Sequence, residues 1–277
     1  MFGRESLAIS AKRLQKAGLK YIELHGNHYG SDMGYSYKQT IDILRSNGLE
    51  VSGVAALFSQ DFDLAAISAV SRQAAIDYIK REVDFAAAMN AKYLLVIPGA
   101  VGRITPYDPF EFERSAETLR TVADLFVKNH IKAAIEPIRR AEVSLVHSVA
   151  DAKRYIGQVD HPGVAHINGD VFHMLTEEKH IGEAIIDAND MLINLHLGDT
   201  NRDAIGEGTL DIDTIIMSLY IIGMNNPGRF VTGEPIGSSA NPFEAMYGYP
   251  DSKMLNQIVN KTSVYFKERE EIVLSLD

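Results

Sequence analysis

Four polar residues stand at the ends of short apolar runs in the second half of the chain: Glu136, Asp170, His196 and Glu234. Consecutive members are 26 to 38 residues apart, which is about one strand–helix repeat each. If these runs are neighbouring parallel strands, the four side chains meet around one point. Three carboxylates and one imidazole suit a hard or borderline divalent cation. The alternative for each residue alone is a loop cap or a surface hydrogen bond.

Such a site requires strands whose carboxyl ends lie at the same edge of one sheet. Short apolar runs alternate along the chain with segments of helical periodicity, such as 66–89 and 110–129. Repeated strand–helix units predict a parallel sheet with right-handed crossovers. The candidate strands cover residues 21–24, 51–57, 93–97, 131–136, 164–167, 192–197 and 229–233. Because a TIM (β/α)8 barrel needs ~250 residues, the sequence predicts an α/β protein with one TIM-barrel domain over residues 1–277.

One strand of the eight is not found. The chain begins with a helical pattern at residues 7–17, ahead of the first candidate strand. We therefore expect the first barrel strand to be missing from this numbering, and a strand formed by residues 1–8 would contradict this. Several candidate strands end in polar residues or turn formers, such as Asn168-Gly169-Asp170. Polar residues at strand ends are typical of the barrel face that carries the active site.

Composition excludes several kinds of chemistry. The chain has no cysteine, which excludes disulfides, a thiolate nucleophile and any Cys-ligated metal, and which fits a cytoplasmic protein. Its net charge of −10 lacks the basic field that binds nucleic-acid phosphates. No apolar run approaches the ~18 residues of a membrane span. We therefore expect neither a nucleic-acid nor a membrane partner.

Three further polar residues follow the first set within six positions: Glu142, His173 and Arg202. In order, spacing and strand position, these segments resemble the ketose 3-epimerase group (D-tagatose and D-psicose 3-epimerases) of the xylose-isomerase-like TIM barrels. The resemblance runs from the second barrel strand to the C-terminus and is most specific over residues 131–236.

The resemblance implies a cofactor, a substrate and a role for each of these residues. It makes Glu136, Asp170, His196 and Glu234 the metal ligands and Glu142, His173 and Arg202 the substrate contacts. It also makes Glu136 and Glu234 the catalytic pair, which removes and returns the C3 proton of a ketose through an enediolate. The cofactor would be one divalent metal ion per subunit, Mn first, then Mg, Co or Zn. The partners would be a small sugar and further copies of the chain, in a dimer or tetramer.

Each substrate contact has a simpler alternative. His173 could be a structural histidine that follows a barrel strand, and Arg202 could be an exposed charge on a loop. Glu142 could pair with Arg139 or Arg140 near the surface.

Other functions remain open, because a fold does not fix a function. A related metal-dependent epimerase, isomerase or dehydratase could act on a ketose phosphate, hydroxypyruvate or an inosose. Residues 237–239, Gly-Ser-Ser, could donate to a phosphate or could be only a turn. An apurinic-site endonuclease would need histidines at earlier strand ends, where the chain has Ala55-Ala56 and Pro98-Gly99, and another in Asp211-Ile212-Asp213. A non-catalytic sugar-binding relative is the third alternative.

Overall fold

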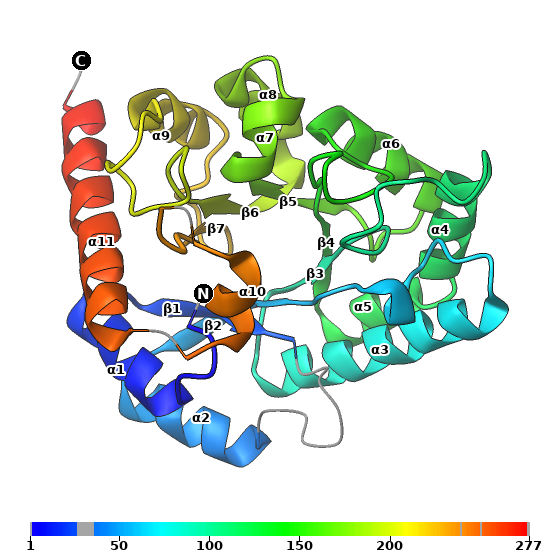
Figure 1. Cartoon of the computed structure of the whole chain (residues 1–277), viewed down its shortest axis with the longest axis horizontal. Helices are drawn as coiled ribbons and strands as arrows, with labels where there is room; N and C mark the ends of the chain where they lie inside the picture. Colours follow the sequence, from blue (N-terminus) through cyan, green and yellow to red (C-terminus); the bar gives the residue numbers. More distant parts are fainter. Residues whose placement is uncertain (1, 27–35, 239, 250, 276–277) are drawn as a thin grey trace.

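The computed structural model describes residues 2–26, 36–238, 240–249 and 251–275 (Figure 1). Seven strands form one parallel sheet in which neighbours along the chain are neighbours in space. The strands are β1 (Tyr21–His25), β2 (Glu50–Ala55), β3 (Tyr93–Val96), β4 (Lys132–Ile135), β5 (His166–Asp170), β6 (Leu192–Leu197) and β7 (Phe230–Gly233). Figure 1 shows them as a ring with the helices around its outside. The α/β TIM barrel predicted from the sequence is therefore confirmed, with seven strands.

Helices connect the strands, and most of them cover the outer face of the ring, whereas the short helix at residues 242–247 lies over the opening of the ring in Figure 1. They are α1 (Leu7–Lys16), α2 (Tyr37–Ser46), α3 (Ala69–Ala88), α4 (Glu111–Arg120), α5 (Ala123–Asn129), α6 (Val149–Val159), α7 (Val171–Glu177), α8 (Ile181–Ala188), α9 (Ile212–Ile221), α10 (Pro242–Tyr247) and α11 (Ser252–Leu274). Side-chain caps mark several starts; at α6, Ser148 and Asp151 form a capping box. Among the described residues, no helix is both long enough and apolar enough to cross a bilayer.

The sheet has two free edges, which are β1 and β7. Residues 2–6 contain no strand and α1 begins at Leu7, as the sequence led us to expect for this part of the chain. The rings of Tyr21 on β1 and Phe230 on β7 approach each other, with centroids 5.1 Å apart. A cavity of about 1230 Å³ lies between these two strands, lined also by residues of α1 and α11.

Two predicted element boundaries were wrong. The candidate strand ended at residue 167, but β5 continues through Asn168, Gly169 and Asp170. Gly169 suits this position because a Cβ would come within 2.9 Å of the Leu195 side chain on the neighbouring strand, which would then have to shift. The helical pattern at 110–129 is broken between α4 and α5, where the hydroxyls of Thr118 and Thr121 bond to carbonyls of the preceding turn.

Candidate metal centre

The four predicted metal ligands lie at the carboxyl ends of four consecutive strands. Asp170 is the last residue of β5, and His196 is the penultimate residue of β6. Glu136 and Glu234 directly follow β4 and β7, and their backbone N–H groups extend the parallel ladder to Val96 and Leu197. The strands are parallel, so their carboxyl ends lie at the same edge of the sheet and all four side chains reach it.

The ligand atoms converge on one buried point. Nδ1 of His196 lies 3.4 Å from a carboxylate oxygen of Glu136 and 4.0 Å from one of Glu234. One ligand atom each from Asp170, His196 and Glu234 falls within a mutual distance of 4.8 Å. Metal bonds of ~2.0–2.2 Å place two ligands of one ion at most about 4.4 Å apart. The mixture of oxygen and nitrogen donors suits a divalent cation, and the spacing of the Asp170, His196 and Glu234 atoms is close to what one ion needs.

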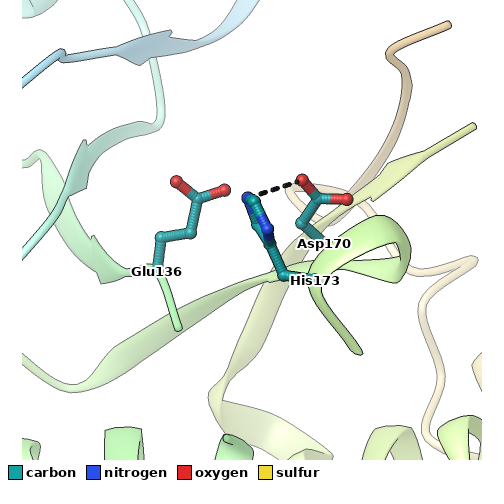
Figure 2. A group of neighbouring side chains, drawn as sticks. All are labelled: Glu136, Asp170 and His173. Atoms are coloured by element: carbon teal, nitrogen blue, oxygen red, sulfur yellow. Dashed lines mark ion pairs between the residues drawn. The ribbon is translucent and has the colours of Figure 1, made fainter. Parts of the chain in front are cut away.

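His173 belongs to the same cluster. Figure 2 shows its ring between the carboxylates of Glu136 and Asp170, with Nε2 3.3 Å from an Asp170 oxygen. The donor atoms of these three residues also lie within 4.8 Å of one another. The sequence assigned His173 to the substrate, and the structure places it directly against two of the predicted metal ligands.

The cluster holds more negative charge than its own cations balance. Burial raises the pKa of Glu136, and burial together with the charge of Glu234 raises the pKa of Asp170 to about 7. Burial also raises the pKa of Glu234, but His196 and Arg202 outweigh it and hold that pKa below its usual value. Burial lowers the pKa of His196, but the nearby carboxylates have the larger, opposite effect and hold this pKa well above its usual value. A bound divalent cation would take the place of the protons that these acids retain.

Glu23 completes the site and was missed in the sequence. One of its carboxylate oxygens lies 2.7 Å from Nε2 of His196, and the other accepts a hydrogen bond of 2.8 Å from the buried hydroxyl of Tyr93. A carboxylate on one imidazole nitrogen leaves the other nitrogen to face a metal, as in carboxylate–histidine–metal arrangements. The signal was a single glutamate inside the apolar run at residues 21–24.

Arg202 lies beside the cluster, on the loop that follows β6. Its guanidinium donates to a Glu234 oxygen at 3.2 Å and stacks 4.2 Å from the centre of the Phe172 ring. Its backbone is left-handed, with φ 59°. Asp199 holds this loop by accepting backbone N–H bonds, among them one of 2.7 Å from Gly206. The structure therefore places Arg202 beside the predicted ligands.

Glu142 has the partner that the simpler alternative proposed. Nε of Arg139 donates to its carboxylate at 2.6 Å. The Arg139 guanidinium also stacks on the Phe172 ring, 4.4 Å from its centre. Phe172 thus contacts both Arg139 and Arg202. Because Arg139 holds Glu142, this glutamate lies beside the cluster and not within it.

The candidate phosphate-binding run lies beyond β7. The backbone N–H of Ser238 donates to an Asp203 carboxylate oxygen at 3.2 Å. Ser239 lies outside the described residues. The donor that a phosphate would need at Ser238 is therefore bonded to an acidic side chain.

Known proteins share both the sequence pattern and the fold. The family model for the xylose isomerase-like TIM barrel matches residues 11–235. A ketose 3-epimerase of Arthrobacter globiformis is 24% identical over 83% of this chain and 78% of its own length. A 3-dehydro-D-guloside 4-epimerase of Escherichia coli (strain K12) is 30% identical over 51% of this chain and 56% of its own.

A solved structure of an L-ribulose 3-epimerase superposes on 99% of this chain and 92% of its own, with a TM-score of 0.85 and 18% identity. The resemblance to the ketose 3-epimerases is therefore confirmed. Because the family model matches most of its length, the chain belongs to the xylose isomerase-like TIM barrel family.

Proposed function

We propose that the protein is a metal-dependent carbohydrate epimerase that inverts C3 of a ketose through an enediolate. The observation that carries this proposal is the placement of two carboxylates around one centre. Glu136 and Glu234 approach the same nitrogen of His196 from the ends of β4 and β7. An epimerase needs a base on one face of a carbon and an acid on the other.

The environments of the two glutamates support complementary roles. Burial raises the pKa of Glu136, whereas His196 and Arg202 lower the pKa of Glu234. Groups whose pKa values are driven apart can hold a proton on one and a negative charge on the other. In that state Glu234 would take the C3 proton and Glu136 would return one, and the reverse reaction exchanges the roles.

The other residues would hold the metal and the substrate. Glu136, Asp170, His196 and Glu234 would bind a divalent cation, which supplies Lewis-acid stabilisation of the negative charge that develops on the substrate oxygens. Two buried nitrogens, Nδ1 of His173 and Nε of Arg202, have no hydrogen-bond partner among the described residues. Such atoms are available to donate to substrate oxygens as charge develops.

Three finer properties belong to the same proposal. We propose Mn as the resident ion, because the donors are oxygen and nitrogen only. We also propose a homo-oligomer, a dimer or tetramer, and a cytoplasmic location, on the resemblance and on the absence of cysteine. Light scattering on the purified protein tests the oligomer, and a monomer would contradict it.

Glu136→Gln separates catalysis from binding, and Glu183→Gln on the exposed face of α8 is the matched control. Both proteins are loaded with Mn²⁺ and assayed on D-psicose, D-tagatose, D-fructose and L-ribulose. We expect Glu136→Gln to bind Mn²⁺ more weakly and, at saturating Mn²⁺, to lose about 10²–10⁴-fold in kcat, the usual contribution of a proton-transfer residue. Unchanged kcat would contradict the role of Glu136. A wild-type protein that binds a ketose tightly but converts none would instead be a sugar-binding relative.

A further inference from the structure

A layer of polar side chains lies one step below the predicted metal ligands. Asn168, Asn194 and Thr232 stand two positions before Asp170, His196 and Glu234, respectively. Strand side chains alternate between the two faces of a sheet, so residues two apart point the same way. Asn168 and Asn194 are fully buried and are direct partners in the pairing of β5 with β6. The strands that carry the candidate site therefore also carry this second layer.

Hydrogen bonds link the three side chains to Glu136. The Thr232 hydroxyl donates to Oδ1 of Asn194 at 2.8 Å. Nδ2 of Asn194 donates to Oδ1 of Asn168 at 2.7 Å. Nδ2 of Asn168 donates to a Glu136 carboxylate oxygen at 2.9 Å. The chain of bonds crosses from β7 to the end of β4.

The direction of this chain follows from the ionised form of Glu136, whose carboxylate can only accept. An amide donates only through nitrogen and accepts only through oxygen. Because the oxygen of Asn194 accepts from Thr232, its nitrogen faces Asn168. The nitrogen of Asn168 then faces Glu136. A flipped Asn168 would turn its oxygen toward the carboxylate and two amide nitrogens toward each other. In this arrangement the other two bonds keep Nδ2 of Asn168 directed at one oxygen of Glu136.

Packing alone does not account for these residues. Asparagine is depleted in strands, where β-branched and aromatic residues pack better. A buried polar group without a partner destabilises the fold, so each amide is tolerated only because the next one satisfies it. An apolar barrel interior would avoid this dependence altogether. The layer is thus explained by what it does for Glu136.

We propose that Asn168, Asn194 and Thr232 are positioning residues that hold the Glu136 carboxylate in the orientation needed to bind the metal ion. The inference rests on the proposed function, since Glu136 is a ligand and a proton carrier only there. Partners of metal ligands typically contribute 10- to 100-fold to metal affinity or activity.

Thr232 offers a test at a distance, because it bonds to Asn194 and not to Glu136. Its side chain also bonds to Tyr93, so Asn168→Ala is the variant that tests the route to Glu136 directly. Thr232→Val keeps the branched shape and removes the hydroxyl, whereas Thr232→Ser keeps the hydroxyl. Thr118→Val is the matched control, since the Thr118 hydroxyl bonds only within α4 among the described residues. Asn168→Ala removes the donor itself. Mn²⁺ affinity is measured by calorimetry, kcat and KM on the ketose panel, and folding by circular dichroism.

We expect Thr232→Val to weaken Mn²⁺ binding and to lower kcat by about 3- to 10-fold, with KM changed less than about 2-fold, and Asn168→Ala to lose 10- to 100-fold. Thr232→Ser and Thr118→Val should stay within about 2-fold of wild type. If folded Thr232→Val and Asn168→Ala bind Mn²⁺ like wild type, the positioning role is overturned and the proposed function stands. If wild type itself does not bind Mn²⁺, the proposed function fails and this inference fails with it.

Discussion

Binding of Mn²⁺ should weaken steeply as the pH falls below 7. A carboxyl group binds a metal far more tightly once it is ionised. Burial with the neighbouring charge of Glu234 raises the pKa of Asp170 to about 7. Protons therefore compete with the cation in a range where an exposed aspartate would already be ionised. Glu136, whose pKa is also raised, adds to the effect.

The size of the effect follows from Asp170 alone. With a pKa of about 7, the ionised fraction of this carboxyl falls from about 76% at pH 7.5 to about 3% at pH 5.5, so Mn²⁺ affinity should fall by about 25-fold or more. Without the metal, the contribution of Asp170 to the free energy of unfolding changes with pH in the opposite direction to the Mn²⁺ affinity. Between about pH 4 and pH 7 the folded state holds a proton that the unfolded state has released, so this group costs stability as the pH rises. Bound Mn²⁺ removes that cost, so the increase in Tm on adding Mn²⁺ should grow with pH.

Titration calorimetry in buffers of different ionisation enthalpy measures both the affinity and the protons released. We expect about one proton or more released per Mn²⁺ at pH 6 and fewer at pH 8.5. Affinity that is constant between pH 5.5 and pH 7.5, with no proton released, would refute the reasoning that burial keeps these acids protonated.

Three further substitutions test the surroundings of the site. Gly53→Ala should lower Tm by several degrees, because its Cβ would come within 2.2 Å of the Tyr93 ring and overpacking costs about 1–3 kcal/mol. Gly157→Ala on α6 is the control, because a Cβ there meets no described atom within 4 Å. This second variant should not lower Tm in the same thermal scan. Glu23→Ala should weaken Mn²⁺ binding by about 10- to 100-fold in calorimetry, because His196 loses its carboxylate partner; wild-type affinity would contradict this. Arg139→Ala should raise KM for the ketose and leave Mn²⁺ affinity unchanged, because Arg139 holds Glu142 outside the ligand cluster; weakened Mn²⁺ binding would show that it acts on the cluster.

The sequence was sufficient to predict the fold and the residues at the strand ends. Parallel strands that alternate with helices bring their carboxyl ends to one edge, so spacing alone placed Glu136, Asp170, His196 and Glu234 together. This prediction needed the positions of the strands but not the conformations of the side chains.

What lies beneath the strand ends could not be predicted in the same way. Asn168 and Gly169 form a pair that usually marks a turn, yet Gly169 here accommodates Leu195 and the strand continues. The partners of Glu23 and Asn194 lie on other strands, so their roles depend on which residues face inward and how the strands are staggered. Glu142 could pair with either Arg139 or Arg140, and the spacing of these residues does not decide between them; the structure pairs it with Arg139.

Proton exchange at C3 tests the central claim most directly. The Mn²⁺-loaded protein is incubated in heavy water with the four ketoses, the metal is removed, and the sugars are examined by NMR. The proposed mechanism predicts deuterium at C3 together with the C3 epimer, because the proton removed by one glutamate is replaced by one from the other. Deuterium at C1 with formation of an aldose would contradict it in favour of an aldose–ketose isomerase. No exchange into any of the sugars, with Mn²⁺ shown to be bound, would contradict a ketose epimerase.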